Sequence, residues 1–188
     1  MTEPQRRLLM DATTVEETLS RMAGQILQEA GGTDRLMLVG IHRRGVHLAT
    51  WLARDIERSH GVQLPTGSLD ITLYRDDLMT VGPRPVVGPT RLPNAGIDEQ
   101  LVVIVDDVLY TGRTVRAALD ELADYGRPRK TLLAVLVDRG GRELPIQADI
   151  VGRTIRVAEG GRVEVLVPEL DGKLGVELVG ETAGEGGA

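Results

Sequence analysis

One segment, from Val102 to Thr114, constrains the fold of this chain more than any other. It reads V-V-I-V-D-D-V-L-Y-T-G-R-T, an aliphatic run that stops at two acids and then passes through a Thr/Gly turn. Leu101 to Val105 are nearly all β-branched or aliphatic, which is typical of a strand buried on both faces of a parallel sheet. Val115 to Tyr125 has the apolar spacing of an amphipathic helix. The segment therefore predicts a strand, a turn and a helix in an α/β protein.

The polar residues of this segment have the chemistry of a sugar phosphate site. Asp106 and Asp107 are expected at the carboxyl end of the strand, where open α/β sheets bind ligands. Residues 111–114 open the helix, so their unpaired N–H groups can converge on an anion. Carboxylates accept hydrogen bonds from vicinal hydroxyls or coordinate Mg²⁺. A ligand with a diol and a phosphate fits both halves, although an ordinary βα corner with threonines as helix caps is the alternative.

The whole segment resembles the phosphoribosyl pyrophosphate (PRPP) signature of type I phosphoribosyltransferases. V-D-D-V-L-Y-T-G-R-T is close to its form in the PyrR-type pyrimidine operon attenuation regulators that are also uracil phosphoribosyltransferases. L-D-I-T-L-Y-R-D-D-L at Leu69 to Leu78 and V-D-R-G-G-R-E-L-P-I at Val137 to Ile146 also resemble that family. The resemblance implies a mostly parallel twisted sheet flanked by helices, with a small hood and a mobile lid loop. It also implies Mg²⁺-dependent transfer of ribose 5-phosphate to uracil, giving UMP and pyrophosphate.

Length and composition set further bounds. The 188 residues suit one domain, expected over 1–180 with a lid at about 76–97, a hood formed by the N-terminal and 138–180 segments, and a flexible tail at 181–188. The absence of Cys excludes a disulfide framework and a Cys nucleophile. No run approaches the roughly 18 apolar residues of a membrane span, and the N-terminus lacks a signal peptide pattern. We expect a cytoplasmic protein.

Charge and aromatic content limit the kinds of partner. Lys plus Arg total 22 and Asp plus Glu total 28, a net charge of −6, so a nucleic-acid surface would have to be a local patch. With no Phe, three Tyr and only Trp51, the chain has few platforms on which bases could stack. The histidines, His42, His47 and His60, are scattered and propose no structural metal site.

The remaining elements follow from periodicity and breakers. Thr13 or Thr14 is expected to cap a first helix that ends at Gly31 and Gly32. A buried strand at Leu36–Ile41 precedes a helix at Val46–Ser59. Further strands are expected at Leu69–Leu73, Thr131–Val137 and Ile150–Gly152, with a hairpin of Arg162–Val167 and Leu174–Val179.

The resemblance assigns roles around the acid pair. Asp106 and Asp107 are expected to hold the ribose hydroxyls of PRPP, to contribute to Mg²⁺ held mainly by the substrate, and to stabilise the cationic sugar as pyrophosphate leaves. The phosphate of PRPP or UMP is expected in the loop formed by Val108, Leu109, Tyr110, Thr111, Gly112, Arg113 and Thr114.

A second loop has the composition of a pyrophosphate site. His42, Arg43, Arg44 and Gly45 join a strand to a helix; adjacent guanidiniums suit a polyanion, and Gly permits close backbone approach. Related enzymes have a pyrophosphate loop here, often with a non-proline cis peptide and commonly with Thr in place of Arg43. A solvated basic turn is the alternative. Arg75, at the root of the lid, is expected to reach the leaving pyrophosphate as a further catalytic residue; the alternative is a salt-bridged hairpin base.

The last assignments concern the base and RNA. Val137, Asp138 and Arg139 resemble the hood segment that reads the base. Arg21, Arg142 and Arg153 are candidate contacts to pyrimidine-operon leader RNA. Relatives tend to differ at Ser20, Gly24, Glu29, Gly141 and Gln147, where they have Thr, His, Arg, His and Arg.

Each lost cation removes a phosphate contact, and such contacts dominate RNA affinity. Our hypothesis is therefore an intact catalytic site with leader-RNA binding weakened, changed or absent. A UMP-sensing attenuator with minor catalysis and a purine phosphoribosyltransferase remain alternatives. The family also suggests a homodimer or higher assembly.

Overall fold

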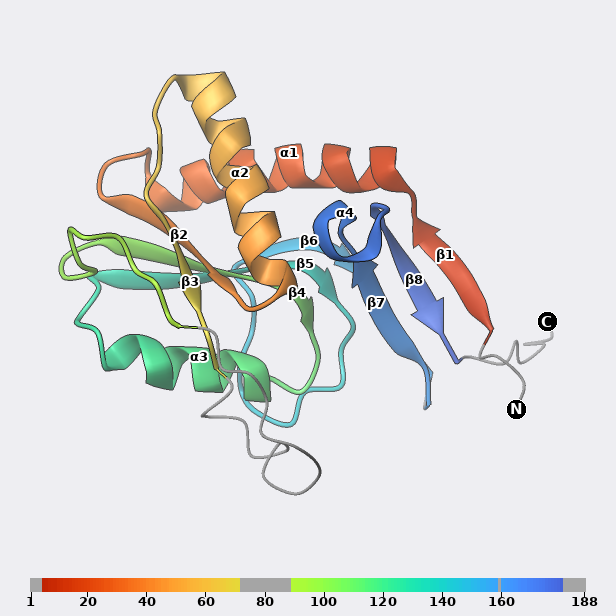
Figure 1. Ribbon diagram of the computed structural model, residues 1–188. Helices are drawn as coiled ribbons and strands as arrows, with labels where there is room; N and C mark the ends of the chain where they lie inside the picture. Colours follow the sequence, from red (N-terminus) through yellow and green to blue (C-terminus); the bar gives the residue numbers. More distant parts are fainter. Residues whose placement is uncertain (1–4, 72–88, 159, 181–188) are drawn as a thin grey trace.

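Two β-sheets organise the chain (Figure 1). The computed structural model describes residues 5–71, 89–158 and 160–180. In these ranges a five-stranded parallel sheet has the order β3-β2-β4-β5-β6, and a three-stranded antiparallel sheet, the hood sheet, has the order β1-β8-β7. The parallel sheet comprises Leu36–Ile41 (β2), Thr66–Leu69 (β3), Leu101–Leu109 (β4), Lys130–Asp138 (β5) and Ile150–Thr154 (β6). The hood sheet comprises Arg6–Met10 (β1), Arg162–Leu166 (β7) and Gly175–Val179 (β8). The predicted fold, a parallel sheet with a small hood, is confirmed.

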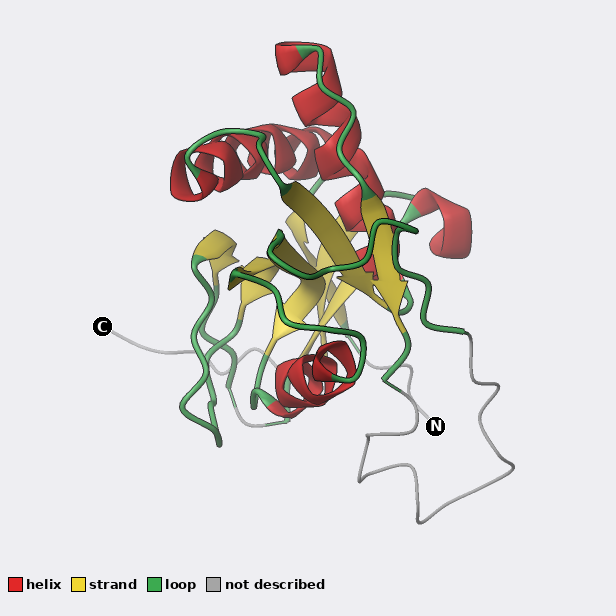
Figure 2. Cartoon of the chain, turned by 90° about the vertical axis from the view of Figure 1, so that its left-hand side faces the viewer, coloured by secondary structure: helices red, strands yellow, loops and turns green. Residues whose placement is uncertain are grey.

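The helices cover both faces of the parallel sheet (Figures 1 and 2). They are Ala12–Ala30 (α1), Arg44–His60 (α2), Arg113–Ala123 (α3) and Pro168–Asp171 (α4). Because strand side chains alternate between faces, Leu36 and Leu38 of β2 join the core under α1 and α2, whereas Met37 and Val39 join the core under α3. None of the described helices is both long and apolar enough to span a membrane.

Helix α1 begins two or three residues earlier than a Thr cap would place it. The Asp11 carboxylate accepts a hydrogen bond from the Thr14 N–H at 2.9 Å, so Asp11 is the N-cap and the predicted Thr13 or Thr14 cap is wrong. Asp is as good a cap as Thr because both offer a side-chain oxygen to the first orphan N–H groups. The predicted end is confirmed, since Gly31 closes the helix with φ 73°.

Several strand limits differ from those expected. Strand β3 begins at Thr66, earlier than the predicted Leu69–Leu73. Strand β4 does not stop at the acids but continues to Leu109, because its neighbour β5 continues to pair with it. Strand β1 and helix α4 were not predicted. Residues 76–88 of the expected lid and the expected tail lie outside the described residues.

The connections create a topological switch point at one edge of the parallel sheet, the position where doubly wound sheets form a crevice. β2 leads through α2 to β3 in one direction, and β4 leads through α3 to β5 in the other. The two helices lie on opposite faces, as right-handed crossovers require when the direction reverses. The carboxyl ends of β2 and β4 therefore diverge at a topological switch point, where doubly wound sheets bind ligands.

Candidate active site

The loop after β2 packs directly on the strand that carries the acids. A Cβ atom on Gly45 would lie 2.4 Å from the Val105 carbonyl oxygen and 3.3 Å from the Asp106 Cα. Only glycine allows the start of α2 to approach β4 this closely. The His42–Arg43 peptide bond is cis, as the sequence resemblance led us to expect. The predicted acid and basic loops are thus adjacent at the switch-point crevice.

The acid pair is tightly held by the backbone. Asp106 is buried, and its Oδ1 accepts the Asp107 N–H at 2.9 Å; Asp107 Oδ1 accepts the Val108 N–H at the same distance. Burial raises the pKa of Asp107, while the Val108 N–H and the positive charge of Arg44 act in the opposite direction. A carboxylate whose pKa burial raises is stabilised in its charged form by a cation beside it.

The predicted phosphate loop connects β4 to α3. Gly112 is the N-cap of α3 with φ 93° and has no side chain to cap the helix, although the Thr111 hydroxyl oxygen accepts the Arg113 N–H at 3.3 Å. The next N–H groups of the first turn can therefore meet an anion. The Thr111 carbonyl accepts the N–H groups of Glu143 and Leu144 at 3.0 and 3.1 Å. These bonds brace the loop against the segment that follows β5. Arg113, expected in the same loop, forms an exposed ion pair with Glu143 at 2.7 Å.

The basic residues predicted to bind pyrophosphate differ in their exposure to solvent. His42 and Arg43 are exposed at the crevice, and Arg44 is partly buried in the first turn of α2. Arg44 Nη2 contacts both carboxylate oxygens of Asp171 in α4, at 2.9 and 3.2 Å. Arg75 lies outside the described residues, so its predicted role stays a prediction.

The segment expected to read the base borders a pocket of about 350 Å³. Asp138 lines this pocket. The Val137 side chain is fully buried in the core, so only its backbone could meet a base. The other residues that line the pocket are Gly140, Arg142, Gln147, Ala148, Thr154, Ile155 and Arg156.

Beside this pocket, Arg139 stacks on the Tyr110 ring of the phosphate loop. The Arg139 guanidinium carbon lies 3.9 Å from the ring centroid. A Cβ on Gly141 would lie 2.5 Å from Tyr110 Cε2, so the tyrosine occupies the space that a side chain at position 141 would need. The stack joins the phosphate loop to the segment expected to read the base.

Comparison with known proteins agrees with this geometry. Residues 9–166 match the family model described as phosphoribosyl transferase domain. A bifunctional protein PyrR from Herpetosiphon aurantiacus is 54% identical over 163 residues, covering 87% of this chain and 90% of that protein. One from Thermus aquaticus is 53% identical, covering 90% of this chain and 93% of that protein. The chain belongs to the PyrR family of phosphoribosyltransferases.

Solved structures of more distant proteins share the fold. A hypoxanthine phosphoribosyltransferase from Trypanosoma cruzi has a TM-score of 0.68 at 20% identity, covering 94% of this chain and 95% of that chain. One from Staphylococcus aureus has a TM-score of 0.62 at 18% identity, covering 91% and 90%. At these identities the likeness establishes the architecture and does not establish the base.

The three arginines predicted to contact RNA in this PyrR family member also hold the fold together. Arg142 donates to the carbonyl oxygens of Ile146 and Tyr110, both at 2.9 Å, and to Asp138 Oδ2 at 2.5 Å. Arg21 donates to the carbonyl oxygen of Gly152.

Arg153 donates to the Leu9 carbonyl oxygen at 2.7 Å, and this bond connects β6 to the hood.

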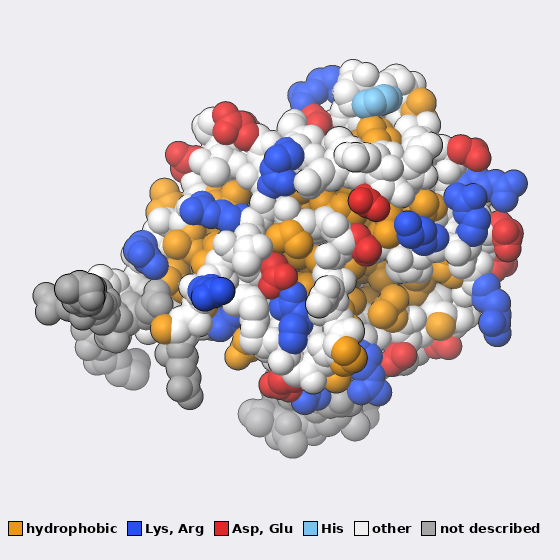
Figure 3. Space-filling view, turned by 180° about the vertical axis from the view of Figure 1, so that it is seen from behind, with side chains coloured by type: hydrophobic (Ala, Val, Ile, Leu, Met, Phe, Trp, Pro, Cys, Tyr) orange, Lys and Arg blue, Asp and Glu red, His pale blue; other side chains and the backbone are white. Residues whose placement is uncertain are grey.

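On the face shown in Figure 3, basic side chains are interspersed with acidic and apolar ones. The sequence did not predict the structural roles of Arg21, Arg142 and Arg153, because most of the partners are backbone carbonyl groups, which carry no sequence signal.

The Asp138–Arg142 pair makes the stability of the fold depend on pH. Partial burial acts to raise the pKa of Asp138. The hydrogen bonds from Arg142 and from the Gly140 N–H, together with the positive charge of Arg142, outweigh this effect and lower the pKa. A lowered pKa stabilises the fold above the ordinary Asp pKa of about 3.9, and this contribution is lost as the pH falls through the folded-state value.

We expect Asp138→Asn to lower the free energy of unfolding at pH 7 by about 1 kcal/mol. The difference from the unaltered protein should shrink below about pH 4, where the unaltered protein loses the same charge. Urea unfolding at several pH values measures this. The difference for Arg142→Gln should shrink at low pH without vanishing, because its bonds to the carbonyl oxygens of Ile146 and Tyr110 do not depend on the charge of Asp138. A difference for Asp138→Asn that stays constant down to pH 2 would contradict the assignment.

The carboxylates of the crevice offer hard oxygen ligands but no complete metal cage. Among residues 5–71, 89–158 and 160–180, no group of three or more His, Cys, Asp or Glu side chains could hold a metal ion. Asp106 and Asp107 alone fit a Mg²⁺ ion whose remaining ligands come from a substrate and water.

Proposed function

We propose that this protein is a uracil phosphoribosyltransferase, which forms UMP and pyrophosphate from uracil and PRPP. The observation that carries the proposal is the direct packing of the Arg43–Gly45 loop on the strand end that bears Asp106 and Asp107. This packing places a basic loop, an acid pair and a helix N-terminus around one crevice. PRPP has the matching parts: a pyrophosphate, a ribose diol and a 5-phosphate.

Each part of the crevice has a role in the reaction. The N-terminus of α3 and Thr111 bind the 5-phosphate through directed hydrogen bonds, and the helix dipole adds about 0.3 to 1 kcal/mol. Arg43 and Arg44 bind the pyrophosphate oxygens. The acids accept hydrogen bonds from the ribose hydroxyls. These contacts fix the sugar so that its anomeric carbon faces the base.

The acids also favour the transition state. The bond from the anomeric carbon to pyrophosphate breaks with its electron pair leaving on oxygen, and a bond to uracil N1 forms as N1 releases its proton to solvent. Positive charge develops on the sugar ring, as in other glycosyl transfers. The fixed negative charge of Asp106 and Asp107 stabilises it. Mg²⁺ held by these acids and the pyrophosphate oxygens would offset the charge of the leaving group.

The pocket beside Asp138 is the proposed site of the base. Its volume of about 350 Å³ lies at the lower end of the usual range for ligand pockets and can hold a nucleobase. Uracil presents both donors and acceptors, which Asp138, Gln147 and nearby backbone groups can match.

One assay decides between uracil and the purine alternative. Uracil, hypoxanthine and guanine are offered together with PRPP and Mg²⁺, and the nucleotides are separated and quantified. We expect UMP as the main product. Preferential formation of IMP or GMP would refute the assignment of uracil.

We further propose that regulation by leader RNA is weakened in this chain, although its relatives carry the name bifunctional PyrR. Ser20, Gly24 and Glu29 on α1 offer no cation to an RNA phosphate, and the net charge of the chain is −6. Arg21, Arg142 and Arg153 remain, but part of their donor capacity is used by backbone carbonyl groups.

We expect the unaltered protein to bind the cognate leader RNA at least about tenfold more weakly than a variant in which His replaces Gly24 and Arg replaces Glu29. Each added phosphate contact in that variant contributes to RNA affinity. Filter binding with and without UMP at fixed salt measures this. Tight, UMP-dependent binding by the unaltered protein would refute the proposal. The expected homodimer or higher assembly stays a prediction that analytical ultracentrifugation can test.

A further inference from the structure

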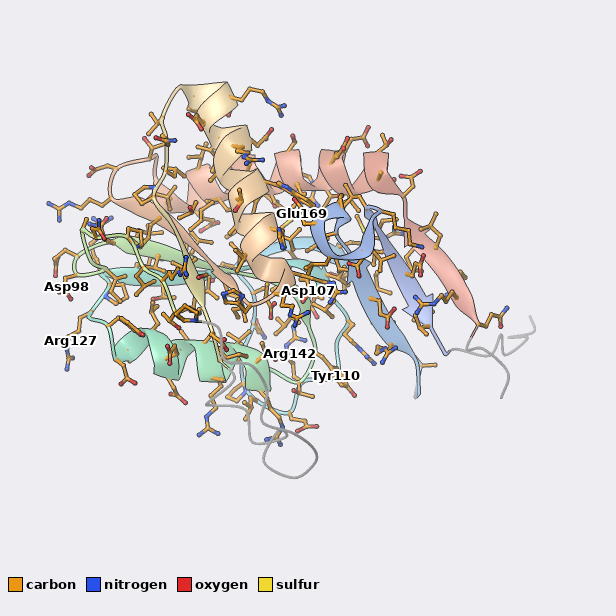
Figure 4. All side chains as sticks on the ribbon, in the orientation of Figure 1. Asp98, Asp107, Tyr110, Arg127, Arg142 and Glu169 are labelled. Carbon is orange, nitrogen blue, oxygen red and sulfur yellow. The ribbon has the colours of Figure 1, made fainter. Side chains whose placement is uncertain are left out.

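The short hood helix α4 contacts the first turn of α2, beside the acid pair (Figure 4). Two acids of α4 face two residues of α2. Asp171 accepts from Arg44 Nη2 at 2.9 and 3.2 Å, and Glu169 Oε2 lies 3.8 Å from His47 Nδ1. The hood is thus connected to the loop proposed to bind pyrophosphate.

Asp171 is firmly anchored within the hood. Its Oδ2 also accepts the Val167 N–H at 2.9 Å, which fixes the carboxylate at the start of its own helix. Burial acts to raise the pKa of Asp171, but the hydrogen bonds from Val167 and Arg44 and the charges of Arg44 and Lys173 outweigh it, so the pKa is lowered. The carboxylate that Arg44 meets is therefore fixed and ionised.

Arg44 lies between two acids with different surroundings. Its Nη2 contacts Asp171 in the hood, and its charge lowers the energy of the ionised form of Asp107 on β4. Its Nε is buried and forms no hydrogen bond within the described part of the chain. An arginine side chain carries about 2 kcal/mol of rotamer entropy when it is free. The contact with Asp171 removes much of this freedom before any ligand binds.

We propose that Asp171 is a positioning residue that holds Arg44 ready for the pyrophosphate group of the substrate. This inference rests on the proposed function, because it concerns the same crevice. Asp171 does not touch the substrate and acts only through Arg44. Preorganising a binding side chain improves affinity because the ordering cost is met in the free protein.

The test measures pyrophosphate affinity directly. Isothermal titration with inorganic pyrophosphate and Mg²⁺ compares the unaltered protein with Asp171→Asn, which keeps the size of the side chain and an oxygen for the Val167 N–H. We expect the dissociation constant to rise about tenfold, equivalent to about 1.4 kcal/mol. KM for PRPP should rise similarly, while KM for uracil should not change. Unchanged pyrophosphate affinity would overturn the inference.

Glu169→Gln is the matched control, since it removes the same charge from the same helix. Its side chain is 43% exposed and its contact with His47 is long, so pyrophosphate affinity and KM for PRPP should stay the same. An equal loss of pyrophosphate affinity in both variants would show that the affinity depends on the charge of α4 and not on the contact of Asp171 with Arg44.

A double-mutant cycle separates positioning from general damage to the hood. In an Arg44→Gln background, Asp171→Asn should cause no further loss of pyrophosphate affinity, because Asp171 acts only through the Arg44 side chain that this background lacks. Losses that add would overturn the inference. Failure of the unaltered protein to bind pyrophosphate and to make UMP would instead overturn the proposed function.

Discussion

Replacing Asp107 by Asn is expected to lower kcat for UMP formation by about 100- to 1000-fold, the effect of removing one preorganised charge from a transition state. Asn keeps the shape of the side chain and an oxygen for the Val108 N–H, which Asp107 accepts at 2.9 Å. It removes the negative charge beside the developing cationic sugar. A uracil assay with saturating PRPP and Mg²⁺ measures the loss.

The fold should tolerate this substitution. Burial raises the pKa of Asp107, so the charged form is costly in the free protein and its removal should not reduce stability. We expect the melting temperature to stay the same or to rise. Asp120→Asn, which removes an exposed acid in α3, is the matched control and should leave kcat unchanged. Activity retained in Asp107→Asn would refute the role of the acid pair.

Gly45→Ala is expected to lower the free energy of unfolding by about 3 kcal/mol, at the upper end of overpacking effects. The new Cβ would lie 2.4 Å from the Val105 carbonyl oxygen, and both groups belong to rigid backbone. The first turn of α2 must then move away from β4. UMP formation should fall as well, because this movement separates Arg44 from Asp107. Urea unfolding and the uracil assay measure the two effects.

Gly24→Ala is also a glycine-to-alanine substitution, but we expect it to stabilise the fold. Gly24 lies within α1, and its added Cβ would meet nothing within 4 Å. Alanine there should raise the free energy of unfolding by about 0.5 to 1 kcal/mol, because glycine is the more flexible residue in the unfolded chain. If Gly45→Ala were as stable as Gly24→Ala, the close packing of α2 on β4 would be contradicted.

The sequence predicted the parallel sheet well because its signals are local. Buried strands such as β2 and β5 are continuous aliphatic runs, and β2 was predicted with the limits observed. Signals at the ends of elements were less reliable. Asp11, and not Thr13 or Thr14, caps α1, since several neighbouring residues could supply the same oxygen. Strand β4 continues past the acids because β5 pairs with it, which is a property of the neighbour.

Helix α4 was not predicted, although its sequence contains the usual signals of a short helix. The segment V-P-E-L-D-G has Pro at the first helical position, acids in the first turn and Gly after the last residue. These features predict a short helix. They do not predict that Asp171 meets Arg44, because the two residues are far apart along the chain and their contact depends on how the hood packs on the core.

The buried strand that carries the acid pair, the Thr/Gly turn after it and the helix that follows were determined by the sequence from Val102 to Thr114 alone, because strand, turn and helix signals there are contiguous. Tertiary structure alone decided which groups surround that segment. The approach of Gly45 to Val105, the Arg139–Tyr110 stack and the contact between Asp171 and Arg44 all join distant segments. Such contacts follow from strand order and packing, which no local pattern of residues encodes.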